Sequence, residues 1–351
     1  MPASSGRHYA ALGAGLTLIF ALAAPAAAED ADVYQEASAG RSATLDPLGA
    51  IANPSDLDEL ISVDSITGEI APLQVGVATG GSGLIVGRAG DSSYTNPGID
   101  VVWGGYLGGS SGADILLYDR DTGWFEFRTV DGSGLTSPFW EALGTRGWSH
   151  VVPGDYNGDD IADLLFYRAS DGLMRFYTIT AGGTFRAMTP VMYGNRGWTQ
   201  MIPGDFDANG TDDLMWYRAS DGLMRFYTVT STGRFTPMTP VMYGNRNWDR
   251  IPSGDFDADG RDDLMYYRST DGLYRFYTIS AIGRFTAISA VGYTDTGWNQ
   301  ILAGRFGAGQ GADLVFYQPG AIQALASSKT DLVPITYATA IRANLIFTVP
   351  D

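Results

Sequence analysis

Aspartate and asparagine residues occupy alternate positions in three short loops of this 351-residue chain. The loops lie 50 residues apart, and each carries four such side chains at loop positions 1, 3, 5 and 9. Alternate residues of a turning chain point inward, so the four side chains should converge, and several oxygen ligands together favour a hard cation such as Ca²⁺. The predicted ligands are Asp155, Asn157, Asp159 and Asp163; Asp205, Asp207, Asn209 and Asp213; and Asp255, Asp257, Asp259 and Asp263. The sequence therefore predicts about three structural Ca²⁺ ions, with metal-free Asx turns as the alternative.

Each of these loops must turn sharply after its third predicted ligand. Glycine adopts the left-handed conformations of such turns without steric cost. It stands at this place as Gly210 and Gly260, whereas the first loop has Asp160 there. The first loop is therefore the least regular of the three.

The second loop and the strand after it resemble a known repeat. Residues 204–214 read Gly-Asp-Phe-Asp-Ala-Asn-Gly-Thr-Asp-Asp-Leu and precede the apolar run 215–217. This pattern is similar to the FG-GAP or VCBS repeats of the integrin alpha-subunit propeller and of many secreted bacterial proteins, over about residues 94–345. The resemblance implies a β-propeller with calcium bound between the first two strands of a blade. It implies no single activity, since such propellers serve adhesion, ligand binding and scaffolding.

Tryptophan recurs at intervals of 50 residues, a period typical of propeller blades. The four residues are Trp148, Trp198, Trp248 and Trp298. Each unit reads as four short strands, with an Asp-Gly turn of type I′ between the second and the third. In the unit 198–247 these strands are expected at residues 198–203, 214–218, 223–230 and 235–243.

We expect an all-β fold, a β-propeller of four-stranded blades with five clear repeats. The repeats cover about residues 94–147, 148–197, 198–247, 248–297 and 298–345. A propeller ring must close, and a sixth, composite blade can form from both ends of the chain. In that arrangement a C-terminal strand at 345–349 pairs with N-terminal strands within 73–90, and the propeller domain spans 73–351.

The N-terminus reads as an export signal. Residues 1–28 combine a basic start, an apolar run at 12–22 that is too short to span a bilayer, and small residues up to Ala28. A membrane anchor is the alternative. Residues 29–72 are polar and are expected to form a flexible leader with one short helix at 54–61. We expect a secreted protein, extracellular or periplasmic after cleavage near Ala28, with no membrane insertion.

Composition disfavours several classes of function. A net charge of −17 repels nucleic acid and anionic lipid surfaces, and the absence of cysteine excludes disulfides. His150 is the one histidine after the signal peptide, so a histidine metal site or a repeated Ser-His-Asp triad is not available. We interpret Glu126 and Glu141 as exposed surface charges, and Asp212 and Asp262 as solvated loop residues. No catalytic residue is predicted, and a hydrolase is the least favoured function.

Two linkers between repeats combine aromatic side chains with hydrogen-bond donors, as sugar-binding surfaces do. The candidate ligand-binding residues are Tyr193, Asn195, Arg196, Trp198, Tyr243, Asn245, Arg246 and Trp248. The alternative is that Trp198 and Trp248 pack between blades and the arginines pair with nearby acids. We expect a secreted, calcium-binding propeller that acts as an extracellular binding or adhesion module for a protein or cell-surface ligand. A multivalent carbohydrate-binding lectin is the alternative, and no sequence feature specifies an oligomeric state.

Overall fold

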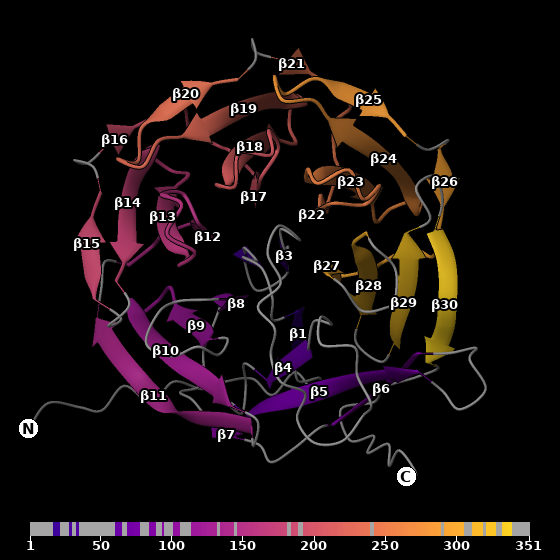
Figure 1. Ribbon diagram of the computed structural model, residues 1–351, viewed down its shortest axis with the longest axis horizontal. Coiled ribbons are helices and arrows are strands. Elements are labelled where there is room, and N and C mark those ends of the chain that lie inside the picture. Colours follow the sequence, from indigo (N-terminus) through magenta and orange to yellow (C-terminus); the bar gives the residue numbers. More distant parts are fainter. Residues whose placement is uncertain are drawn as a thin grey trace, which may run out of the picture.

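The computed structural model describes the side chains of residues 114–128, 146–180, 184–188, 192–238, 242–288, 291–304 and 311–318, and otherwise the backbone of the strands named below. The regular elements of these parts are all β-strands, and they form six antiparallel sheets. Figure 1 shows the sheets around a central space, with β12, β17, β22 and β27 on the inner side of their sheets. The predicted all-β class and the repeated four-stranded unit are confirmed.

The sheets follow one another along the chain. The first comprises β1 (Thr17–Ala21), β4 (Leu60–Asp64), β5 (Glu69–Val77), β6 (Leu84–Arg88) and β7 (Ser93–Tyr94). The second comprises β8 (Val101–Gly105), β9 (Asp114–Asp119), β10 (Trp124–Asp131) and β11 (Gly134–Leu143). The third comprises β12 (His150–Gly154), β13 (Asp163–Arg168), β14 (Leu173–Ile179), β15 (Phe185–Ala187) and β16 (Met192–Tyr193), joined by β2 (Ala28–Glu29) and β3 (Val33–Tyr34).

The remaining three sheets repeat the pattern of the third. The fourth comprises β17 (Gln200–Gly204), β18 (Asp213–Arg218), β19 (Leu223–Val229), β20 (Phe235–Pro237) and β21 (Met242–Tyr243). The fifth comprises β22 (Ser253–Gly254), β23 (Asp263–Arg268), β24 (Leu273–Ile279), β25 (Phe285–Ala287) and β26 (Gly292–Tyr293). The sixth comprises β27 (Gln300–Gly304), β28 (Asp313–Gln318), β29 (Ala321–Ser327) and β30 (Leu332–Ala338).

The fourth sheet shows how one unit is built. The acidic loop joins β17 to β18, and the strand register places Gly204 opposite Asp213 at the mouth of that loop. The strands β20 and β21 both pair with β19, one near its end and the other near its start. The single outer strand predicted at 235–243 is therefore two short strands.

A four-residue turn joins β18 to β19, with the N–H of Gly222 donating to the carbonyl of Arg218 at 2.9 Å. Gly222 has a φ of 74°, and Asp221 is not left-handed, so the predicted type I′ turn is wrong. Asp221 instead accepts from the N–H of Leu223 and holds the Arg218 guanidinium through two hydrogen bonds of 2.9 and 2.7 Å. These bonds satisfy the polar groups of the turn and leave glycine at the one position that needs a positive φ.

Neighbouring sheets are joined through tyrosines on their second strands. The Tyr167 hydroxyl donates to the carbonyl of Asn195 at 2.9 Å and accepts from the N–H of Trp198 at 3.3 Å. Tyr217 and Tyr267 make the same two bonds 50 and 100 residues later. Each tyrosine is fully buried. One hydroxyl thus fixes the linker that carries the chain from one sheet to the next.

The N-terminal sheet begins earlier in the sequence than predicted. The strand β4 and the first residues of β5 lie within 29–72, the segment expected to form a flexible leader. Leu60 and Ile61 were expected to end a helix and instead lie in β4, where β-branched Ile61 and Val63 favour the strand. The rest of that predicted helix lies outside the described residues. Among the described residues there is no helix with the length and apolar character needed to cross a membrane.

The predicted composite blade differs from the observed first sheet. Its strands β1, β4, β5, β6 and β7 all come from the first 94 residues, and only β6 and part of β5 lie in the predicted range 73–90. The strand β5 contacts β11, and β6 contacts β30. Residues 345–349 lie outside the described residues, so the pairing of that C-terminal strand stays a prediction.

Two glycines with the same backbone conformation allow steric clash to be separated from backbone strain. A Cβ on Gly222 would lie 2.3 Å from the carbonyl oxygen of Gly244, whereas a Cβ on Gly147, whose φ is 75°, meets no atom within 4 Å. We expect Gly147→Ala to lower the free energy of unfolding by about 1 kcal/mol through strain alone. Gly222→Ala should lower it by about 3 kcal/mol or more, because overpacking is added. Urea denaturation of both variants measures this, and equal losses would contradict the packing seen at the turn.

Candidate metal centre

The strands β17 and β18 bring the ends of the second acidic loop together, as β22 and β23 do for the third. Carboxylate oxygens of Asp205, Asp207 and Asp213 all lie within 4.8 Å of one another. Asp255, Asp257 and Asp263 form the same cluster in the next repeat. The structure therefore unites positions 1, 3 and 9 of both loops, as the spacing predicts.

Two left-handed residues curl each loop. In the second loop these are Ala208, with a φ of 59°, and Gly210, with a φ of 83°. This curl aims backbone donors at the first carboxylate: the N–H groups of Asn209 and Gly210 donate to the two oxygens of Asp205 at 3.0 and 2.8 Å. The sharp turn predicted at Gly260 is confirmed by its φ of 87°. Glycine is needed at this position for its positive φ and not for lack of space, because a Cβ there would meet no atom within 4 Å.

The ninth residue of each loop is the most demanding group of the site. Asp213 and Asp263 are fully buried, and neither carboxylate oxygen of either residue has a hydrogen-bond partner in the described structure. Burial raises the pKa of Asp213 to about 9, with further contributions from the charges of Asp207 and Asp205. Burial also raises the pKa of Asp263 to about 8, assisted most by the charge of Asp257 and opposed by the Thr278 side chain. Each cluster therefore needs protons or a cation to balance its charge.

The fifth position of the loops does not join these clusters. The side chains of Asp159, Asn209 and Asp259 are exposed. Each accepts a hydrogen bond from the backbone N–H two residues later, at 2.8 to 3.0 Å. These Asx turns hold the side chains at the loop surface, and in the third loop Asp259 lies outside the cluster of Asp255, Asp257 and Asp263.

The first loop differs because asparagine stands at its third position. The Asn157 amide donates to both oxygens of Asp163, each at 3.0 Å. Asp163 is also fully buried, yet its pKa is raised only to about 7, mainly by burial, because hydrogen bonds from Thr178 and Asn157 oppose the shift. This loop satisfies its buried carboxylate from within the protein, so it is a weaker metal candidate than the other two.

Asp212 and Asp262 have a structural role that the sequence did not predict. Asp212 Oδ2 accepts from the N–H of Asp155 in the preceding repeat at 2.8 Å, and the N–H of Asp212 donates to the Asp155 carbonyl at 2.8 Å. Asp262 makes the same two bonds to Asp205, at 3.0 and 3.1 Å. Both are buried, so the interpretation as solvated loop residues is wrong. The repeated Asp-Asp pair was the only signal of this link in the sequence.

These links explain the glycine that precedes the first aspartate in the first two loops. A Cβ on Gly204 would lie 2.9 Å from Asp262 Oδ2. On Gly154, a Cβ would meet Asp212 Oδ2 at 3.0 Å and the Tyr156 ring at 2.8 Å. The glycine before the first aspartate therefore admits the carboxylate of the next repeat. The hydrogen bonds of Asp212 and Asp262 therefore fix the distance between neighbouring loops.

The predicted ligand-binding residues divide into exposed and buried sets. Tyr193 and Tyr243 are 69% exposed, whereas Trp198 and Trp248 are 1% and 5% exposed. The Trp198 ring packs 5.4 Å from that of Trp216. The tryptophans cannot stack on a ligand, and their alternative assignment as packing residues is the one that the structure favours. The neighbouring Asn195, Arg196, Asn245 and Arg246 are all exposed.

Glu126 was expected at the surface and is instead buried. Its side chain is 2% exposed and forms an ion pair with Arg128 on the same strand, β10. A buried carboxylate is retained where a charged partner compensates its loss of hydration. The side chain of Glu141 lies outside the described residues.

Comparisons with known proteins leave the family of this chain open. No family model and no curated protein matches it. Among solved structures, it is similar to a functionally unknown protein from Desulfotomaculum acetoxidans, with a TM-score of 0.49, 10% identity, and coverage of 82% of this chain and 81% of that one. It is also similar to a proposed 6-phosphogluconolactonase from Bacteroides fragilis, with a TM-score of 0.48, 11% identity, and coverage of 95% and 97%. Similarities of this size say nothing about activity or ligand.

The raised pKa values of Asp213 and Asp263 predict an unusual pH dependence without metal. Between about pH 4 and pH 9 the folded chain keeps protons on these groups that the unfolded chain releases, so stability should fall as the pH rises. We expect the melting temperature in EDTA to decrease across this window, and excess Ca²⁺ to reverse the decrease at its upper end. Calorimetry at several pH values measures both effects.

The control for this experiment is the double variant Asp213→Asn with Asp263→Asn. Other groups titrate in the same window, but the variant cannot release these two protons. Its melting temperature in EDTA should depend less on pH than that of the unmodified chain. Parallel profiles for the two proteins would contradict the assignment.

Proposed function

We propose that this chain is an exported, calcium-stabilised β-propeller that acts as an extracellular binding module. The observation that carries the proposal is the pair of fully buried, unpartnered carboxylates, Asp213 and Asp263, each beside two further carboxylates. Leaving such a group charged and unpaired in the interior is costly. A divalent cation with oxygen ligands removes that cost, and Ca²⁺ suits a loop of carboxylates and backbone carbonyls.

Two loops fit Ca²⁺ better than the third. Asp205, Asp207 and Asp213 would hold one ion, and Asp255, Asp257 and Asp263 would hold another. The first loop has an amide on its buried aspartate, so its ion would bind more weakly. When bound, Ca²⁺ supplies positive charge that fixes the start of the second strand in each repeat. Calcium is thus a structural group in this proposal.

The proposed architecture is a closed ring of six blades. Five sheets carry the repeat, and the N-terminal sheet contacts the strands on both sides of it, β11 and β30. Ring closure would cover both faces of the N-terminal sheet with the neighbouring sheets. The resemblance of the loops to FG-GAP or VCBS repeats supports the same architecture.

A binding role suits this scaffold better than catalysis. Asp212 and Asp262, the carboxylates next to the ninth loop position, each accept a backbone N–H from the neighbouring repeat. Glu126 is held by Arg128. Because these carboxylates are already engaged in structural contacts, they are poor candidates for catalytic acids or bases. Hydrolysis is therefore the less favoured alternative. The exposed tyrosines of the linkers, repeated every 50 residues, present a multivalent surface instead.

Calcium stoichiometry tests the metal assignment. We expect isothermal titration to show two tight Ca²⁺ sites and a weaker third one. Asp207→Asn gives the second loop the asparagine of the first, and it should weaken one tight site about tenfold or more by removing a ligand charge. The matched variant Asn157→Asp should convert the weak site into a tight one. If neither exchange changes the isotherm, the loops do not hold the ions.

Export is tested separately. The segment ending at Ala28 should be cleaved during secretion, which would remove β1 and leave β4, β5, β6 and β7 in the first sheet. Mass spectrometry of the exported protein should find an N-terminus at Glu29. Recovery of the full-length chain in the membrane fraction would instead indicate an uncleaved anchor.

A further inference from the structure

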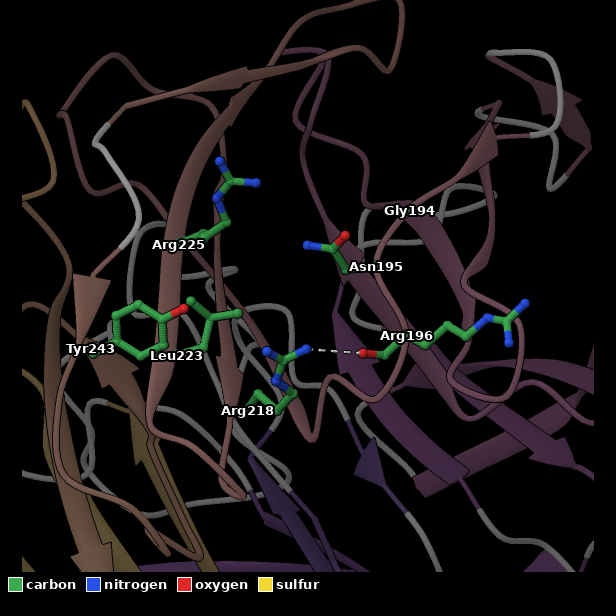
Figure 2. Close-up of a pocket in the computed structure, with 7 residues that line it drawn as sticks. All are labelled: Gly194, Asn195, Arg196, Arg218, Leu223, Arg225 and Tyr243. Atoms are coloured by element: carbon green, nitrogen blue, oxygen red, sulfur yellow. Dashed lines mark hydrogen bonds between the residues drawn. The ribbon is translucent and has the colours of Figure 1, made fainter.

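An open groove lies between the third and fourth sheets. It has a volume of about 590 Å³, within the range of small-ligand sites. Its walls come from both repeats: Asn195 and Arg196 belong to the linker after β16, Arg218 ends β18, Leu223 and Arg225 lie on β19, and Tyr243 lies on β21. Figure 2 shows the Asn195 amide and the Arg225 side chain on opposite walls of the groove, with the amide pointing across it.

The two inner arginines of this groove differ in their partners. The Arg218 guanidinium is neutralised by Asp221 through two hydrogen bonds, and it lies over the Trp198 ring at 5.6 Å. Arg225 lies over the Tyr227 ring at 5.5 Å, and its Nε is buried without a hydrogen-bond partner in the described structure. No carboxylate is paired with Arg225 in the described part of the chain. A hydrogen bond to the Tyr227 side chain uses one of its donors, but no carboxylate of the described residues neutralises its positive charge.

The surroundings of Arg225 suit a sugar that carries an acidic group. A guanidinium binds a carboxylate or sulfate through paired N–H donors, and more strongly than a neutral hydroxyl. The Asn195 amide can bond hydroxyls of the same ring. Tyr243 is 69% exposed and provides an aromatic surface at the groove for the C–H face of a sugar.

The next repeat has the same arrangement. Arg268 is held by Asp271 at 2.9 and 2.6 Å and lies over the Trp248 ring at 5.6 Å. Arg275 lies over the Tyr277 ring at 5.2 Å, and its Nε is again buried without a partner in the described structure. Tyr293 is 70% exposed. Equal surfaces on successive repeats of one rigid body favour a ligand that is itself a polymer.

We propose that the groove at Arg225 and the equivalent surface at Arg275 bind successive acidic units of a uronate- or sulfate-bearing polysaccharide. This inference rests on the proposed role as an extracellular binding module, and it names the ligand class. The acidic group pairs with the guanidinium, which no carboxylate of the described residues neutralises, and the sugar ring lies against the exposed tyrosine. A neutral sugar lacks the first contact. An acidic peptide has the charge without the ring that the tyrosine and amide accommodate.

The test uses the mature, Ca²⁺-loaded protein and four probes: galacturonate oligomers, heparin oligomers, neutral dextran oligomers and poly-glutamate. We expect galacturonate or heparin oligomers to bind, and dextran not to bind. Galacturonate carries carboxylates only, whereas heparin is sulfated, so these two probes show which acidic group the groove prefers. Binding of dextran with equal affinity, or of poly-glutamate alone, would overturn the proposal.

Substitutions locate the site. Arg225→Gln and Arg275→Gln together should weaken acidic-glycan binding by at least about tenfold, because each removes a charge-assisted pair of hydrogen bonds. Tyr243→Ala with Tyr293→Ala should also weaken it. Arg234→Gln with Arg284→Gln is the matched control, since these exposed arginines lie at the turns before β20 and β25, away from the groove lining. If the test and control pairs lost the same binding affinity, the effect would come from net charge alone, and the proposal would be overturned.

Calcium titration of the same samples distinguishes failure of the groove inference from failure of the calcium assignment. If no acidic glycan binds while both tight Ca²⁺ sites are present and the melting temperature is unchanged, the groove inference is wrong and the metal assignment stands. If Ca²⁺ does not bind at all, the proposed calcium-stabilised scaffold fails independently of the groove. Thermal unfolding of each variant in Ca²⁺ confirms that a loss of binding is not a loss of fold.

Discussion

A buried aspartate at the start of the second strand constrains every repeat. The five residues are Asp114, Asp163, Asp213, Asp263 and Asp313, and none is more than 3% exposed. A carboxylate at such a position must be hydrogen-bonded, protonated or matched by a cation. In the third sheet the Asn157 amide meets this need. In the fourth and fifth sheets two further carboxylates approach instead. The loops thus differ in how they compensate the same buried carboxylate, by an amide in one case and by a cluster that can bind a cation in the others.

The links between loops extend this constraint beyond a single repeat. Asp212 bonds the Asp155 backbone in both directions, and Asp262 does so for Asp205. Ala312, which stands where the earlier repeats have Asp212 and Asp262, keeps the backbone bond, to the carbonyl of Asp255. A loop is therefore completed by its neighbour, and a cation that orders one loop also orders the backbone to which the next is tied. Stability in such arrays is shared between repeats and their interfaces.

The sequence predicts those features that depend on spacing along the chain. The repeat pattern located the second strand of the unit 198–247 within a residue, and it located the carboxylates that converge. It could not show that position 5 closes a local turn, because Asx turns and metal ligation use the same residue types. It also could not show that Asp262 faces the preceding repeat or that Trp198 is buried, because these depend on how sheets pack side by side. Arg225 was missed for the same reason: its strand position is ordinary, and only the neighbouring linker makes it part of a groove.

The direction of the second strand separates the two charged surfaces of the molecule. The strand β18 starts at Asp213 in the acidic loop and ends five residues later at Arg218 beside the groove, a span of about 17 Å. This exceeds the screening length of about 8 Å at physiological ionic strength, so the loop carboxylates do little to cancel the field of the arginines. An acidic ligand can therefore approach one end of a protein whose net charge is −17. Bound cations at the other end would further reduce the repulsion, and they would act on the groove mechanically through β18 and the ring of Trp198 that packs against Trp216.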